Sequence, residues 1–314
     1  ACTILEAPIN SPGANNSSIR VAIMKQSFTF AVSGMMLIAA TALTGCSEEK
    51  PLPPARTNQV VIEYVYPDNP EHQQIHDLLR ERQLLERIQE FLSPFRLRWP
   101  LYVRLTDCDG EPDAWYGDDR ITICYEYVEE LRQIMPAETT PSGIEPIDTA
   151  VGPFFDTILH EFAHALFDYA DIPVLGREED AADQVSALIY LNLGREEARR
   201  LIMGTVYAYL WEVEDTDPPT REELADEHGT SEQRAFNLLC IAYGADAELF
   251  EDAVRYGGLP DFRAEICEEE YELILLAYEA LIVPHIDPDL AEEIFDRSWL
   301  PDKSSRMLDR PERN

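Results

Sequence analysis

Basic residues are scarce in this sequence: 25 lysines and arginines stand against 60 aspartates and glutamates, which gives a formal charge of −35. A field of this sign repels phosphate backbones and anionic lipid headgroups, so the composition argues against nucleic-acid binding. Solubility explains the acidity more simply than a specific cationic partner does. Hydrophobic residues make up 45% of the chain, which is enough to build a core and excludes a disordered chain.

Paired cysteines of the C-x-x-C type are absent, which argues against a cysteine zinc site. Cys2 and Cys46 lie in or at the end of the N-terminal region. The other four cysteines are an even number at positions suited to two disulfides in an oxidising compartment. They are Cys108, Cys124, Cys240 and Cys267. The chain also lacks an internal repeat, and after residue 59 no break in composition divides it.

The N-terminal region reads as a leader. Met24 and the charged Lys25 precede a nearly uncharged apolar stretch over residues 28–43. The Leu-Thr-Gly-Cys run that ends at Cys46 resembles the lipobox of bacterial lipoproteins, in which the cysteine becomes the lipidated first residue. Ser47 after it implies sorting to the outer membrane of a Gram-negative cell, facing the periplasm. The alternative is a single transmembrane signal anchor, since the apolar run is almost long enough to span a bilayer.

These features predict a division of the chain into five segments. Residues 1–23 are an expected upstream extension, 24–45 a lipoprotein signal peptide, 46–58 a Pro-rich tether, 59–300 one domain and 301–314 a C-terminal tail.

Periodicity predicts a mainly helical α+β fold with a small antiparallel sheet before a helix at residues 154–169. Strands are expected at residues 59–66, 95–105 and 120–125, and helices at 71–92 and 128–135. The loop 107–119 and the strand after it form an expected hairpin flanked by Cys108 and Cys124. A disulfide there would close a loop of about 16 residues and stabilise the fold by about 3 kcal/mol. The alternative is two buried thiols.

The second half of the domain is expected to be helical throughout. Helices are predicted at residues 154–169, 178–193, 195–213, 230–243, 245–256, 265–282 and 289–295. An acidic loop covers residues 214–229, and Thr230 with Gln233 forms an expected capping box. Cys240 and Cys267 could join two of these helices.

The pattern His160-Glu161-Phe162-Ala163-His164 lies inside the first of these helices. Histidines four residues apart leave the same face of a helix, so two neutral imidazoles can bind one zinc ion. Glu161 is rotated by about 100° from His160 and lies beside the ion, where it can act as a general base. The plain alternative is a helix that merely contains these residue types.

The later pattern Glu179-Asp180-Ala181-Ala182-Asp183 supplies what such a site still needs. Together the two patterns resemble the glutamate-zincin class of metallopeptidases. The resemblance implies that Glu179 is the third metal ligand and that Asp183 hydrogen-bonds a zinc-binding histidine. The spacing agrees, because residues four apart share a helix face and a carboxylate on the far ring nitrogen orients an imidazole. Glu178, one residue earlier, is the rival ligand.

A broader resemblance is carried by HEFAHALFDYADIPVLGREEDAAD, by EHGTSEQRAFNLLCIAYG and by the paired cysteines. The chain resembles a family of secreted bacterial proteins named as putative metallopeptidases, over residues 59–282. The resemblance implies a zincin-like fold and one Zn²⁺ ion that activates water, with Glu161 moving the proton to the leaving amine. His228 is the first candidate for stabilising the oxyanion, followed by Arg234 and Tyr243. A plain loop histidine near a helix N-terminus is the alternative for His228.

The expected function is that of a zinc-dependent peptidase tethered to the envelope through Cys46, with a peptide or protein as substrate. The strand at residues 121–125 is a candidate edge on which an extended peptide could add. The second hypothesis is an inactive metal-binding envelope lipoprotein that acts as a scaffold or chaperone. Ligand types suit zinc, although other divalent ions would fit.

Overall fold

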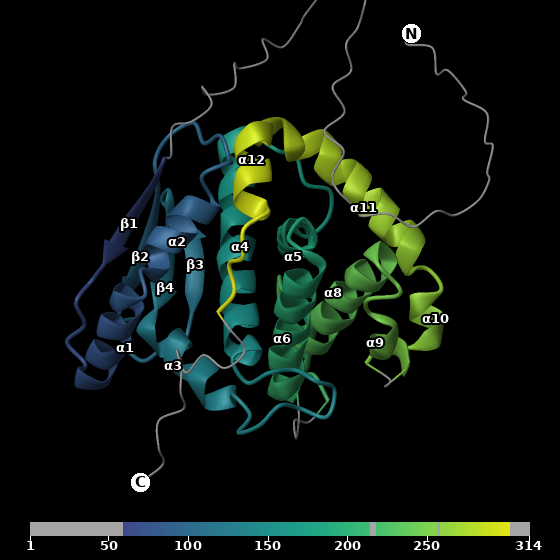
Figure 1. Cartoon of the computed structure of the whole chain (residues 1–314), viewed down its shortest axis with the longest axis horizontal. Helices are drawn as coiled ribbons and strands as arrows, with labels where there is room; N and C mark the ends of the chain where they lie inside the picture. The colour runs from purple at the N-terminus through teal and green to yellow at the C-terminus, as the bar shows by residue number, and fades with distance from the viewer. Residues whose placement is uncertain (1–58, 214–217, 256–257, 302–314) are drawn as a thin grey trace, which may run out of the picture. The chain divides into compact units, whose positions relative to one another are not determined.

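Four short strands form one mixed sheet, which precedes the long helix α4 (Asp148–Ala170) in the sequence and lies beside it (Figure 1). They are β1 (Val60–Tyr64), β2 (Leu101–Thr106), β3 (Ala114–Gly117) and β4 (Arg120–Cys124), in the order β1-β2-β4-β3. β1 and β4 both run parallel to β2, and only β3 is antiparallel to its neighbour β4. The predicted mainly helical α+β class is confirmed, but the prediction of an antiparallel sheet is wrong.

The computed structural model describes residues 59–213, 218–255 and 258–301. The predicted upstream extension, signal peptide, lipidated Cys46 and tether lie outside the described residues, as does nearly all of the predicted tail. Within the described ranges, no helix has the combination of length and apolarity needed to cross a membrane.

The prediction paired the wrong strands in a hairpin: β4 forms its hairpin with β3 and not with the strand expected at residues 95–105. Residues 95–100 do not join the sheet, and the chain after β2 crosses the end of β4 before it returns as β3. β4 therefore becomes an inner strand, and Ile121 to Cys124 are all buried. A strand covered on both faces loses the alternation that identifies an exposed edge. The candidate peptide edge at residues 121–125 is consequently wrong, because the two edge strands are β1 and β3.

A two-residue turn joins β3 to β4. Asp118 and Asp119 both adopt positive φ angles, of 51° and 59°. This is the backbone of a type I′ turn, which matches the twist of a hairpin and which aspartate tolerates better than most residues. The sequence signal was there in Gly117-Asp118-Asp119, but residues 107–119 were predicted to be loop.

The predicted helix over residues 71–92 is two helices, α1 (Pro70–Glu81) and α2 (Leu84–Phe91). The chain breaks at Gln83, whose φ of 55° lies in the left-handed region. The Tyr64 hydroxyl accepts the Leu85 N–H at 2.8 Å and donates to the Glu86 carboxylate at 2.8 Å. A side chain from β1 thus satisfies the start of α2, which a one-dimensional pattern cannot show.

Helix α4 (Asp148–Ala170) is the element to which both halves of the domain attach. Figure 1 shows it between the sheet and the helices that follow. It begins six residues earlier than predicted, with Pro153 in its second turn. Its first residue, Asp148, is buried and pairs with Arg200 at 2.7 Å. Because an unpaired buried carboxylate is costly, this pair explains why the helix extends back into the predicted loop.

Two glycines let α4 lie against α6 (Arg195–Val213) with almost no gap. A Cβ on Gly204 would lie 2.0 Å from the Asp148 carbonyl oxygen, and one on Gly152 would lie 2.6 Å from that of Leu201. Neither position can hold a larger residue without displacing a backbone. The register of α4, the metal-motif helix that carries His160 and His164, is therefore fixed by backbone contact with α6.

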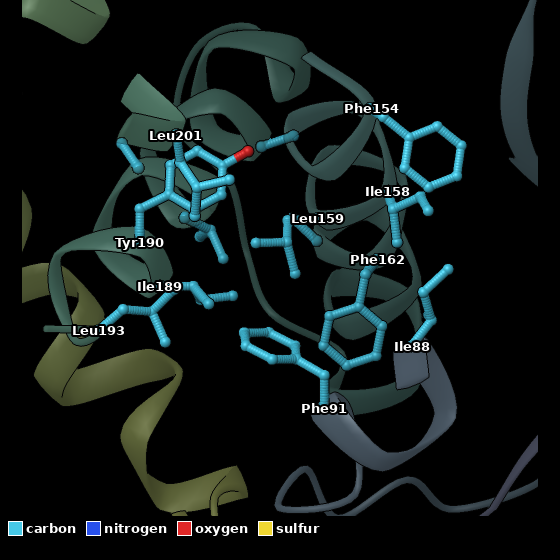
Figure 2. Close-up of a cluster of buried hydrophobic side chains, with 14 of the residues drawn as sticks. Ile88, Phe91, Phe154, Ile158, Leu159, Phe162, Ile189, Tyr190, Leu193 and Leu201 are labelled. Carbon is cyan, nitrogen blue, oxygen red and sulfur yellow. The ribbon is translucent and has the colours of Figure 1, made fainter. Parts of the chain in front are cut away.

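The core is continuous through α2, α4, α5 (Glu178–Leu191) and α6. Figure 2 shows Leu159 and Phe162 of α4 among buried side chains contributed by α2, α5 and α6. Phe162 also packs edge-on against Phe95, with ring centroids 4.7 Å apart. Burial of these large side chains holds α4 and α5 side by side.

The remaining helices follow the prediction except in three places: two short helices, at residues 221–224 and 261–264, were not predicted, and a third is shorter than expected. They are α3 (Tyr125–Ile134), α7 (Arg221–Leu224), α8 (Ser231–Ala245), α9 (Glu251–Arg255), α10 (Asp261–Ala264), α11 (Cys267–Leu281) and α12 (Pro288–Phe295). The predicted helix at 245–256 is only the short α9, because Asp246 turns the chain and accepts the Leu249 N–H at 3.0 Å. The capping box at Thr230 and Gln233 is present.

Both expected disulfides are present. Cys108–Cys124 joins the ends of β2 and β4, and Cys240–Cys267 joins α8 to the start of α11. The pairing agrees with the sequence prediction, although the first bridge ties parallel neighbours and not the two arms of a hairpin.

Candidate metal centre

Three side chains of the two motifs converge on one point. His160 Nε2 and His164 Nε2 lie 3.2 Å apart, on the same face of α4. Glu179 Oε2 lies 2.8 Å from the first nitrogen and 3.2 Å from the second. His160 is 4% exposed at its side chain and Glu179 is 15% exposed, so the group is largely shielded from solvent.

Each of the two helix histidines also has a carboxylate on its other ring nitrogen. His160 Nδ1 lies 2.7 Å from Asp183 Oδ1, and His164 Nδ1 lies 2.8 Å from Glu178 Oε1. An Nδ1–H that donates to a carboxylate leaves the Nε2 lone pair free to bind a metal. Both glutamates considered from the sequence are thus at the centre, Glu179 on the ligand side and Glu178 on the far side of His164.

Arg234 holds the carboxylate that holds His160. Its Nε and Nη2 atoms donate to the two Asp183 oxygens at 2.9 and 2.7 Å. The guanidinium also lies over the Tyr209 ring, 4.8 Å from the centroid. Two donor groups of Arg234 are thus bonded to Asp183, so the contacts of this side chain position His160, while the oxyanion role considered from the sequence stays a prediction. Tyr243 packs against the hydrophobic core.

A further carboxylate, that of Asp156, is buried near the pair formed by Asp183 and Arg234. Asp156 of α4 is 5% exposed and accepts hydrogen bonds from Ser186, Tyr190 and Tyr209, at 2.8 to 3.1 Å. Burial raises the pKa of Asp156, and the negative charge of Asp183 raises it further. Its three hydroxyl donors come from α5 and α6, so the network fixes the position of α5 relative to the metal-motif helix.

Glu161 lies beside the converging atoms and is 9% exposed. Its Oε2 accepts the Tyr116 backbone N–H of β3 at 2.7 Å. Burial raises the pKa of Glu161 above its ordinary value, and the neighbouring imidazoles oppose this shift without cancelling it. A carboxylate with a raised pKa is better matched to accepting and returning a proton near neutral pH.

His228 also lies at this centre. It sits in the loop between α7 and α8, and its Nε2 is 2.9 Å from Glu179 Oε2. Its Nδ1 lies 3.2 Å from Asp226 Oδ1, and its ring stacks near that of His160 with centroids 6.1 Å apart. The side chain is 44% exposed, so it is the accessible member of the group.

The histidines and the carboxylates shift one another's pKa values. Burial acts to lower the pKa of His160, but hydrogen bonds with Asp183 and Glu179 outweigh it and raise the pKa to about 9. The pKa of Glu179 is held far below its ordinary range: burial opposes the shift, while hydrogen bonds from three histidines produce it. Glu179 therefore keeps its negative charge below the pH at which a glutamate is ordinarily protonated.

The donor set fits one divalent ion. Tetrahedral zinc with bonds of about 2.0–2.1 Å holds its ligand atoms about 3.3–3.4 Å apart. The three contacts among His160, His164 and Glu179 are 2.8 to 3.2 Å, close to such an edge. Two imidazole lone pairs and a carboxylate oxygen facing one another at these distances repel unless a cation or protons lie between them.

Three features of the centre were missed by the sequence reasoning. Glu178 was considered as a rival ligand and not as the partner of His164, and Asp226 was not considered at all. An acidic residue two positions before a candidate histidine is a weak signal that could have suggested Asp226. The Tyr116 N–H comes from a strand predicted to be loop, and nothing in the local sequence shows that contact.

A family model described as "Putative metallopeptidase" matches residues 64–282. No curated protein and no solved structure matches the chain. The matched range contains both motifs, both disulfides and the loop that carries His228.

Proposed function

The chain belongs to this metallopeptidase family, and from that membership we propose that it is a zinc-dependent peptidase whose centre is built by His160, His164 and Glu179. The observation that carries the proposal is the convergence of those three ligand atoms within 3.2 Å of one another, beside a buried glutamate. Family membership implies a metal. Zinc is the ion that two imidazoles and one carboxylate favour in a hydrolytic site.

The residues of the chain divide the work. His160, His164 and Glu179 would hold the ion, and Asp183, fixed by Arg234, keeps His160 in the tautomer that binds it. When bound, the ion supplies a Lewis acid and lowers the pKa of water in contact with it. Glu161 accepts the proton of the attacking water at its carboxylate and returns it to the leaving amine.

The edge of β3 offers a place for an extended peptide. The Tyr116 N–H points away from β4 and toward Glu161, so the free edge of the strand runs past the candidate centre. An extended segment there would lie next to the base and donate its N–H groups to outward carbonyl oxygens of the strand, since the Ala114 and Tyr116 N–H groups already bond Asp113 and Glu161. This geometry supports a peptide or protein substrate, and we propose for β3 the role that was first expected of β4.

The experiment is a comparison of wild type with Glu161→Gln. Because Gln cannot accept a proton but keeps the shape and the Tyr116 hydrogen bond, zinc content should stay the same. Cleavage of an unfolded casein should fall by about 10²–10⁴-fold, the usual contribution of a general base. Asp168→Asn, at a carboxylate one turn beyond His164 that bonds the Tyr116 hydroxyl, is the control and should keep most activity.

Equal zinc with equal cleavage in the two proteins would show that Glu161 is not the base. Equal zinc with no cleavage by wild type, tested also on a mixed peptide library, would favour the second hypothesis, a metal-binding scaffold or chaperone without turnover. The two outcomes are distinct because zinc content is measured independently of hydrolysis.

We also propose that the protein is an envelope lipoprotein, tethered to a bacterial membrane through Cys46 and facing the periplasm. The support is the leader-like sequence that ends in Leu43-Thr44-Gly45-Cys46, together with two disulfides, which form in oxidising compartments. Cys46→Ser should release the protein from membranes in a fractionated cell, while wild type stays with them.

A further inference from the structure

His228 has the same pair of contacts as the two helix histidines. All three imidazoles direct Nε2 at one oxygen, Glu179 Oε2, at 2.8 to 3.2 Å. All three place Nδ1 beside a carboxylate of its own. The ligand-type atoms of His160, Glu179 and His228 lie within 4.8 Å of one another, so His228 is at the edge of the same shell.

This arrangement suits a ligand better than a donor. When Nδ1–H of a neutral imidazole donates to a carboxylate, Nε2 carries a lone pair and no proton. Asp226 Oδ1 lies 3.2 Å from Nδ1 of His228, so it can accept an Nδ1–H and leave Nε2 to a metal ion in place of the proton shared with Glu179. An oxyanion donor needs a proton at that same atom. The hydrogen-bond partners of His228 therefore resemble those of His160 and His164. Stabilising an oxyanion, the role expected from the sequence, would require a proton on Nε2 of His228.

We propose that His228 is a displaceable fourth protein ligand, which closes the resting metal centre until a substrate or another metal-binding ligand takes its place. The inference rests on the proposed function, because it concerns the same ion. Sites with four protein ligands are typical of structural zinc, whereas hydrolytic zinc keeps one position for water. The chain would therefore rest in a latent form.

His228 differs from His160, His164 and Glu179 in its exposure and in the element that carries it. Its side chain is 44% exposed, against 4% for His160, 12% for His164 and 15% for Glu179. Those three project from the long helices α4 and α5, whereas His228 stands on the short segment between α7 and α8. A single loop side chain could leave the ion without moving a helix, whereas the other three are buried or nearly buried side chains on α4 and α5.

Capping boxes hold both sides of that segment. Thr220 and Glu223 form one at the start of α7, and Thr230 and Gln233 form the other at the start of α8. Between them, Asp226 accepts the backbone N–H of His228 at 2.9 Å and also approaches its Nδ1. The anchors are local, so movement of His228 needs a change in only a few residues.

The test uses the full chain loaded with Co²⁺, whose visible absorption reports coordination. His228→Ala should open a position, change the absorption spectrum and take up acetohydroxamate at about tenfold lower concentration than wild type, or less. Glu227→Ala, the exposed neighbour on the same loop, is the matched control and should behave as wild type. Equal spectra and equal hydroxamate affinity in all three proteins would overturn the proposal.

A measurement on wild type alone guards against a variant that fails to fold. Nitrogen NMR of the histidine rings, recorded before and after zinc is added, should show metal-induced shifts at Nε2 of His160, His164 and His228. Shifts at only the first two would overturn the proposal, whatever the His228 variant does.

The two proposals fail separately. If neither wild type nor His228→Ala cleaves any substrate but His228→Ala binds hydroxamate more tightly than the control, peptidase activity is wrong and the ligand assignment stands. If Glu161→Gln abolishes cleavage while His228→Ala and Glu227→Ala bind hydroxamate alike, the peptidase stands and the fourth ligand is wrong.

Discussion

At the scale of single residues, His160 and His164 each have one carboxylate beside Nδ1 and another beside Nε2. Asp183 and Glu178 face the Nδ1 atoms of His160 and His164, while Glu179 faces both Nε2 atoms. Replacing one partner removes the orientation of a ring and leaves a buried donor unpaired. The carboxylates therefore matter for metal affinity even where they do not touch the ion.

The same carboxylates make protons compete with the metal. Asp183 and Glu179 raise the pKa of His160 to about 9. A protonated imidazole cannot bind a metal, so the ion must displace a proton at neutral pH. We expect the apparent zinc affinity to rise with pH, by up to about tenfold per pH unit for each proton displaced, and to level off above about pH 9.

A competition titration against a chelating indicator, at pH values spaced between about 6 and 10, measures this dependence. The indicator's own pH dependence is subtracted with a titration that omits the protein. A flat profile over the whole range would show that His160 holds no proton and that its carboxylate partners do not act as described.

The sequence predicted this centre unevenly, for reasons that lie in the residues. His160, Glu161 and His164 share one helix, so a spacing of four residues was enough to group them. Glu179 was preferred to Glu178 because it shares a face with Asp183, and the structure places it on the Nε2 side. The Arg234 clamp joins residues 51 positions apart, and no local pattern encodes such a contact.

At the scale of elements, the position of α4 depends on its contact with α6. Gly204→Ala would push a Cβ to 2.0 Å from the Asp148 carbonyl oxygen. The better helix propensity of alanine cannot offset that overlap, so we expect the free energy of unfolding to fall by about 1–3 kcal/mol. Thermal unfolding should show a melting temperature lower by about 2–4 °C per kcal/mol.

Gly194→Ala is the control for this substitution. A Cβ there would meet no atom within 4 Å. Gly194 is the N-cap residue just before α6, where alanine is only a weaker cap, so the cost should stay below about 1 kcal/mol. If Gly204→Ala and Gly194→Ala melt together, the α4–α6 contact is not as tight as the structure shows.

Element boundaries were predicted well where one helix face decides them and poorly where a distant side chain does. The bounds of α6, residues 195–213, agree with the prediction at both ends. The break between α1 and α2 depends on the Tyr64 hydroxyl of β1, and the early start of α4 depends on the pair of Asp148 with Arg200. Those contacts form only once the chain has folded.

At the scale of the whole molecule, the mainly helical class and the position of the sheet before the metal-motif helix were both predictable. The direction of strand pairing was not. The pairing of β2 with β4 is parallel because the chain crosses over and inserts β3 at the edge. A short strand such as β3, with four residues, gives too little periodicity to be recognised. That edge is the surface on which the proposed substrate path depends.

The most direct test of the account is X-ray diffraction at the zinc absorption edge, from crystals of the zinc-loaded protein. The account predicts one ion bonded to His160 Nε2, His164 Nε2 and the Glu179 carboxylate, at about 2.0–2.2 Å from each. Zinc found only elsewhere, with the Glu179 carboxylate turned away from both imidazoles, would contradict it.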